Sequence, residues 1–164
     1  MKRMLFVLAT LIALTACNGT AKTVEEPGFV KAHDIHQLMK VVVEPQANVY
    51  WNSSGTINDA SGEHDLTPTT DEGWLATQSA AATIAEVGNL LLTPQFAEGR
   101  GNDWQQFARS LVEIGMIAEK AVADRNTDAV MDSGGTMYKV CSACHQVYMP
   151  AARKVQETES GKES

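Results

Sequence analysis

Two cysteines and a histidine near the end of the chain are the residues best suited to chemistry. Cys141-Ser142-Ala143-Cys144-His145 forms C-x-x-C-H, the pattern to which c-type haem is attached. The two thiols can add across the vinyl groups of haem as thioethers, while the adjacent imidazole binds the iron. In a helix, positions i, i+3 and i+4 project from one side. The spacing therefore predicts one covalent haem c, attached at Cys141 and Cys144, with His145 as the proximal iron ligand.

Three other uses of the same residues are a redox dithiol, a disulfide and half of a zinc site. A zinc ribbon needs a second pair of ligands, and no other Cys or Cys/His pair lies near the motif. A thioredoxin-like dithiol usually follows a strand and opens a helix, whereas this motif closes a helical pattern. The adjacent histidine and the exported context favour haem.

Residues 1–16 have the features of an export signal. Lys2 and Arg3 precede a short apolar run, Leu5–Leu14, which is too short to span a membrane in the mature protein. The run ends in Leu14-Thr15-Ala16-Cys17, which resembles the lipobox of bacterial lipoprotein signal peptides. The resemblance implies that Cys17 becomes the lipidated first residue. The alternative is an ordinary secretory signal that is cleaved near Ala16.

Lipidation of Cys17 would anchor the protein to a membrane on the periplasmic side. Asn18 follows rather than Asp, so the resemblance implies the outer membrane in a host that has two. Export agrees with the haem motif, because bacteria attach haem covalently outside the cytoplasm. Lipidation would leave only Cys141 and Cys144 as thiols, so we expect no structural disulfide.

The rest of the chain is organised as a tether, one domain and a tail. Residues 17–31 are polar and predict a flexible tether. Residues 32–155 are long enough for one domain with a sizeable core. Residues 156–164 are polar and predict a disordered tail.

The charge of the chain limits its partners. Its 13 Lys and Arg against 20 Asp and Glu give a net charge of −7, and loss of Lys2 and Arg3 with the leader makes the mature chain more acidic. Nucleic acid is therefore not an expected partner. A redox partner with a basic docking face suits this charge, although an acidic surface also serves solubility alone.

Four segments with helical periodicity predict an all-α domain without strands. They span about 32–51, 69–92, 102–124, and from 127 through the haem motif. Pro45 should kink or split the first. Short connections, apart from a loop at 52–68, favour an antiparallel four-helix bundle with haem near the C-terminal end of the last helix. The expected buried positions are Ile35, Leu38, Met39, Val42 and Val49 in the first segment and Phe107, Leu111, Ile114 and Ala118 in the third.

Helix starts and a glycine pair add detail to this prediction. Thr69 and Asn102 are each followed three residues later by Glu or Gln, the spacing of a capping box. Gly134-Gly135 lies within the fourth segment, where each glycine costs about 1 kcal/mol relative to alanine. The pair either permits close approach of another helix or the macrocycle, or marks a break after which the haem helix begins.

The second axial position of the iron separates the candidate functions, and Met39 fits it best. In an up-down-up-down bundle the last helix ends where the first and third begin. Met39 lies roughly 8 Å into the first helix, whereas Met116 lies roughly 20 Å into the third. His36, one turn earlier, is the runner-up, and Met39 could instead be a core thioether that only packs. The other candidates are expected at the surface or on the wrong side of the haem: His33, His64, Met131, Met137 and Met149.

These features resemble the class II cytochromes c, which comprise cytochrome c′ and its low-spin relatives. The resemblance covers about residues 32–155 and rests on the C-terminal position of the haem motif, four helical patterns, and Met39 in the first of them. Cys141-x-x-Cys144-His145-x-x-Tyr148 also matches the family's C-x-x-C-H-x-x-aromatic pattern. Two departures are Met149, where cytochromes c′ commonly have a basic residue, and the long loop at 52–68. Related bundles often pair as dimers, although no stripe here is clear enough to claim a homodimer.

Two functions follow from these residues. The first is a mono-haem electron-transfer cytochrome of the cell envelope, low-spin with His145 and Met39 as axial ligands, which is a carrier and not an enzyme. The second is a five-coordinate, cytochrome c′-like protein that binds a small gas such as nitric oxide. Met39 argues against the second, because gas binding needs an open iron position.

Overall fold

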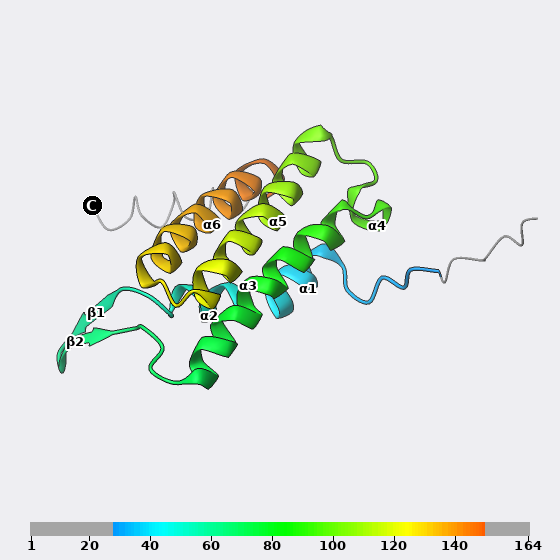
Figure 1. Cartoon of the computed structure of the whole chain (residues 1–164). Coiled ribbons are helices and arrows are strands. Elements are labelled where there is room, and N and C mark those ends of the chain that lie inside the picture. Colours follow the sequence, from blue (N-terminus) through cyan, green and yellow to red (C-terminus); the bar gives the residue numbers. More distant parts are fainter. Residues whose placement is uncertain (1–27, 150–164) are drawn as a thin grey trace, which may run out of the picture. The chain divides into compact units, whose positions relative to one another are not determined.

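The computed structural model describes residues 28–149, which are mostly helical (Figure 1). Residues 31–149 belong to one compact unit. The predicted leader, the lipidation site Cys17, most of the tether and the tail lie outside the described residues. The elements in chain order are α1 (Ile35–Leu38), η1 (Met39–Val43), α2 (Glu44–Trp51), β1 (Thr56–Asp59), β2 (Gly62–Asp65), α3 (Asp71–Leu92), α4 (Pro94–Ala97), α5 (Asn102–Ala123) and α6 (Thr127–Tyr148).

Three helices of 22 residues, α3, α5 and α6, lie side by side (Figure 1). The helices α3 and α5 run antiparallel, since Gly88 lies against Val112 while Gly115 lies against Ala85. Residues 124–126 alone connect α5 to α6, so this pair is antiparallel too. The shorter α2 packs on α3 and also contacts α6. The prediction of an all-α domain is confirmed at this level. Among the described helices none is long and apolar enough to cross a bilayer.

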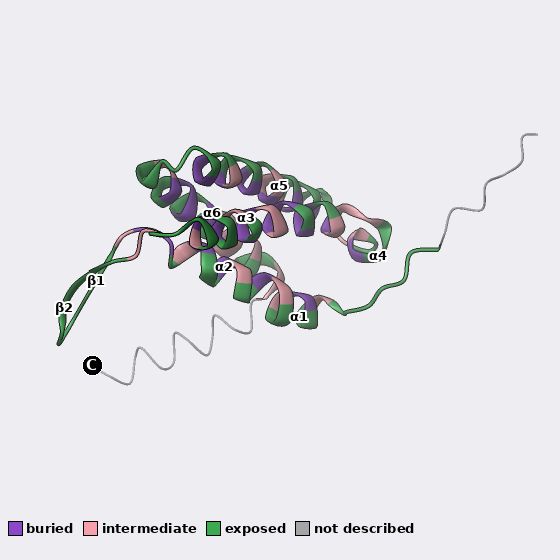
Figure 2. Cartoon of the chain, turned by 60° about the horizontal axis from the view of Figure 1, so that its bottom comes forward, coloured by how far each residue is buried: buried purple, intermediate pink, exposed green. Residues whose placement is uncertain are grey.

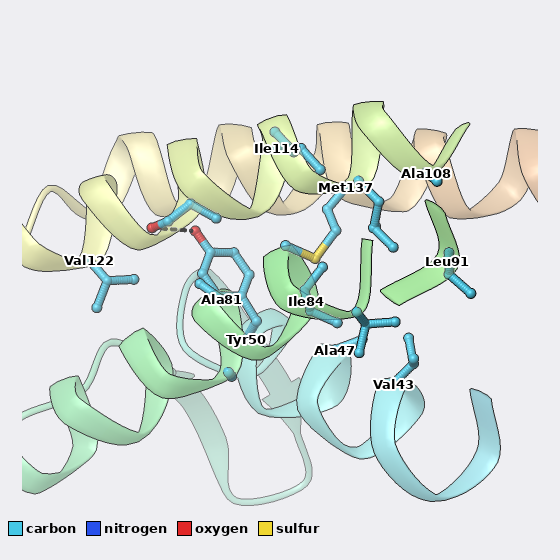
Figure 3. Close-up of a cluster of buried hydrophobic side chains, with 14 of the residues drawn as sticks. Val43, Ala47, Tyr50, Ala81, Ile84, Leu91, Ala108, Ile114, Val122 and Met137 are labelled. Carbon is cyan, nitrogen blue, oxygen red and sulfur yellow. Dashed lines mark hydrogen bonds between the residues drawn. The ribbon is translucent and has the colours of Figure 1, made fainter. Parts of the chain in front are cut away.

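The core lies where these helices face one another, and all of them contribute to it (Figures 2 and 3). Fully buried side chains include Tyr50 from α2, Ile84 from α3, Val122 from α5 and Met137 from α6. Of the stripe predicted for the third segment, all but one residue is buried, and Phe107 is half-buried. The helical periodicity of α5 therefore predicted its inward face well.

A widened helical turn joins α1 to α2. Pro45 has no N–H, and in a regular α-helix its ring would meet the carbonyl of Val41, four residues back. The turn η1 widens into a π-helix instead, in which the N–H of Glu44 donates to the carbonyl of Met39, five residues back. The helical run from 35 to 51 therefore continues past Pro45, which was expected to kink or split it.

The π-turn also explains an error in the predicted buried stripe. The inward residues of this run are Leu38, Val43, Ala47 and Tyr50, and their first step spans five positions. A regular helical period, extended from the first turn, predicts Val49 instead. That prediction is wrong, because Val49 is 39% exposed.

Two elements were not expected from the sequence. Residues 52–68 contain a hairpin in which β1 pairs antiparallel with β2, contrary to the prediction of a domain without strands. Every residue of the two strands is exposed, so no alternation of apolar and polar residues signals them (Figure 2). The short helix α4 begins at Pro94.

Helix starts differ from the predicted capping boxes by one residue. The hydroxyl of Thr70, not Thr69, accepts from the N–H of Gly73 at the start of α3. Asn102 is the first residue of α5 rather than its cap. The first helix begins at Ile35 rather than near residue 32, and Asp34 caps it.

The glycine pair lies inside an unbroken α6. Gly134 is buried, and a side chain there would meet the rings of Trp51 and Tyr50 at 3.4–3.6 Å, whereas Gly135 faces open space. Of the two roles left open for the pair, close approach of another helix is the one observed, and only Gly134 provides it.

Candidate functional site

The C-x-x-C-H motif lies in the last two turns of α6, as expected. Cys141 and Cys144 are half-buried free thiols and His145 is exposed. The helix that carries them begins at Thr127 and is capped by Asn126, whose side chain accepts from the N–H of Ala129. It continues past the glycine pair. The three groups therefore project from one side of a regular helix, which is the arrangement that the motif requires.

Three adjoining cavities surround this end of α6, and together we call them the cleft. Met39 and His145 line all three of them, and Cys141 and Cys144 each line two. The largest cavity has a volume of about 570 Å³, within the roughly 300–1,000 Å³ typical of small-molecule sites. The innermost wall is almost entirely apolar and is formed by Val43, Leu91, Trp104, Phe107, Ala108, Leu111 and Val140.

Met39 and His145 reach the cleft from different elements. Met39 is half-buried at the start of η1, and His145 lies near the end of α6. They are far apart in sequence, yet both border each cavity of the cleft. The structure thus brings together all four residues predicted to bind haem.

Of the other candidate iron ligands, some line the cleft and others do not. His36 is exposed and lines two of the three cavities. Met116 is 61% exposed on α5 and lines none of the three. Met149, at the end of α6, lines two of them. His33 is exposed, and His64 is exposed in β2, where its Nε2 hydrogen bonds with the hydroxyl of Ser61.

Both thiols are poor nucleophiles in this setting. Burial raises the pKa of Cys141, and burial with the nearby Cys141 thiol and the Asp103 carboxylate raises the pKa of Cys144 to about 11. Both thiols therefore stay protonated at neutral pH. Redox-active dithiols instead depend on a depressed pKa that stabilises the thiolate.

A cluster of polar and aromatic residues, which the sequence did not indicate, borders one end of the cleft. The guanidinium of Arg100 lies 4.2 Å from the ring centre of Trp104, and Tyr148 meets the same ring edge-on at 4.9 Å. The hydroxyl of Tyr148 donates to Asp103 at 2.8 Å. Arg100, Asp103 and Trp104 are close in sequence, but Tyr148 joins them only because α5 and α6 meet in the folded chain.

The chemistry of the cleft fits a haem group. It offers two thiols for attachment, an imidazole, a thioether from another helix, and an apolar wall that would exclude water. Among the described residues no group of three or more His, Cys, Asp and Glu is arranged to hold a metal ion directly. A haem iron needs no such group, because the macrocycle supplies four of its ligands.

Comparison with protein-family models, with curated proteins and with solved structures found no match to this chain.

Proposed function

We propose that this protein is a mono-haem c-type cytochrome that carries electrons in the cell envelope and is not an enzyme. The observation that carries the proposal is the convergence of Met39, Cys141, Cys144 and His145 on one cleft. We propose further that the helical run 35–51 and the helices α3, α5 and α6 form an antiparallel four-helix bundle of the class II cytochrome c kind.

Each of the four residues has a separate task in this proposal. Cys141 and Cys144 would hold the haem through thioether bonds, and His145 and Met39 would take the two axial positions. When bound, haem supplies an iron that is reversibly oxidised and reduced by one electron. The Met39 thioether favours a higher reduction potential than a second histidine would.

The walls of the cleft support the same role. Leu91, Phe107 and Leu111 present apolar side chains that would keep water away from a bound haem. The cavity that His145 shares with Lys40, Glu44 and Tyr138 is the largest and opens toward the surface. An edge accessible to a partner and a dry interior are what a carrier needs, and the acidic chain suits a partner with a basic docking face.

The covalent group is tested by mass. The full-length chain is produced in a host that matures c-type cytochromes, and its mass and absorption are measured beside those of the Cys141→Ser/Cys144→Ser variant. We expect the wild type to gain the mass of one haem and to retain its absorbance in denaturant, and the variant to do neither. An unmodified wild-type mass would overturn the proposal.

The lipid anchor on Cys17 belongs to the same proposal and has its own test. Cys17→Ser should move the protein from the membrane fraction to the soluble periplasmic fraction without loss of haem. Retention of the variant in the membrane fraction would refute lipidation and leave the cytochrome proposal intact.

A further inference from the structure

The π-turn η1 lies at the point where the helical run meets the cleft. Its first residue is Met39, whose carbonyl accepts from the N–H of Glu44, and Pro45 follows immediately. A π-turn contains one residue more than the α-turn it replaces, so it rotates everything before it by about 100° relative to everything after it. The residue that faces the cleft is therefore set by the type of this turn.

The burial of neighbouring residues shows the effect of this rotation. Leu38 is 4% exposed and Val43 is 7% exposed, so the core stripe steps five positions across the turn. In an uninterrupted α-helix the core position before Val43 would be four residues back, at Met39. Lys40, now exposed, would then occupy the direction in which Met39 now faces the cleft.

Pro45 opposes that regular helix directly. Leucine and methionine have similar volumes, so exchanging Leu38 for Met39 in the core is a mild change. An α-turn here would force the Pro45 ring against the carbonyl of Val41, whereas the wider turn avoids this contact. Pro45 itself is exposed and lines none of the three cavities.

We propose that Pro45 is a positioning residue which, by enforcing the π-turn, sets the Met39 thioether in the cleft as the sixth ligand and keeps Leu38 in the core. This inference rests on the proposed function. Pro45 touches neither the haem nor the iron in this account, and its whole effect passes through the register of the helix.

Pro45→Ala tests the inference in the haem-loaded protein. We expect the ferric spectrum to change from low-spin to high-spin and carbon monoxide to bind readily, while helix content and covalent haem are unchanged. Pro94→Ala, which removes another exposed proline away from the cleft, should keep the wild-type spectrum. A low-spin, wild-type spectrum for Pro45→Ala would overturn the inference.

Moving the methionine from position 39 to position 40 distinguishes an effect on ligand position from a general loss of structure. The pair Met39→Leu/Lys40→Met should be high-spin when Pro45 is present, because position 40 then faces solvent. The same pair combined with Pro45→Ala should regain the low-spin spectrum, because position 40 then faces the cleft. If the pair fails to restore the low-spin spectrum in the Pro45→Ala background, the turn does not act by rotation and the inference fails.

Failure of the inference and failure of the proposed function give different results. If Met39→Ala leaves the spectrum unchanged, the ligand assignment fails and the inference fails with it. If Met39→Ala becomes high-spin while Pro45→Ala stays low-spin, the ligand assignment stands and only the role of Pro45 is refuted.

Discussion

The helical run 35–51 and α6 are hydrogen-bonded to each other toward one end of the fold, the closed end, and border the cleft toward the other, the open end. At the closed end the hydroxyl of Tyr50, marked by the dashed line in Figure 3, lies 2.7 Å from that of Ser133. The indole N–H of Trp51 donates to the carbonyl of Gly134. Toward the other end Met39 and His145 border cavities instead. The same two segments are therefore joined by hydrogen bonds at one end and leave a cleft between them at the other.

The buried polar groups of the closed end find their hydrogen-bond partners within the protein. Every buried polar side-chain atom in the described part of the chain has a hydrogen-bond partner, and Ser53 and Thr77 form a second buried pair near Tyr50. At the cleft, in contrast, two thiols and an imidazole are gathered beside an apolar wall. The polar groups of the closed end are thus paired within the protein, whereas the cleft presents groups that could bind a ligand.

The largest expected effect comes from leaving the cleft without haem. In the Cys141→Ser/Cys144→Ser variant, amide hydrogens of η1 and of the last turns of α6 should lose protection, with local opening free energies falling toward ~0 kcal/mol. Amides around Tyr50 and Ser133 should stay protected, because their contacts do not involve the cofactor. Hydrogen exchange measures amide protection at both ends in one experiment. An equal loss of protection at the cleft and at the closed end would contradict the difference between them.

A smaller effect is expected from overpacking the closed end. Gly134→Leu forces a side chain toward Trp51 and Tyr50 and should lower the free energy of unfolding by about 1–3 kcal/mol. Gly135→Leu is the matched control, since its side chain enters open space and should raise stability by up to about 1 kcal/mol. Denaturant unfolding of the two variants checks the difference, and equal stabilities would contradict the close approach at Gly134.

The smallest effect is expected from removing one hydroxyl. Tyr50→Phe removes the partner of Ser133, which still donates to the carbonyl of Ala129. The free energy of unfolding should therefore fall by only about 0.5–1.5 kcal/mol. The absorption spectrum of the haem-loaded variant should not change, and a change in spin state would show that the two ends are coupled.

The sequence predicted the long helices well because their periodicity extends over many residues. The approximate extents of α3, α5 and α6 and the buried stripe of α5 follow from apolar spacing and from polar residues near the helix starts. Local choices were harder to predict. Thr69 and Thr70 both qualify as caps, and a single backbone conformation decides between them. The hairpin has no buried face, so its strands left no alternating signal.

The candidate site was predicted in part for the same reasons. The haem motif is contiguous, so its residues could be named directly. Met39 was predicted from its distance along the first helix, whose start lies beside the end of the last helix in an antiparallel bundle. The buried stripe beyond Met39 could not be predicted from a regular period, because the π-turn shifts it to Val43 and Ala47. The contact of Tyr148 with Trp104 depends on tertiary packing, which no local pattern encodes.

The ferric absorption spectrum of the haem-loaded protein, compared between wild type, Met39→Ala and Met116→Ala, tests the central claim most directly. The account predicts low-spin spectra with little response to carbon monoxide for the wild type and Met116→Ala, and a high-spin spectrum that shifts with carbon monoxide for Met39→Ala. A high-spin wild type that binds carbon monoxide would contradict Met39 ligation and favour the gas-binding alternative. A low-spin Met39→Ala would transfer the ligand assignment to another residue of the cleft, with His36 the first to be tested.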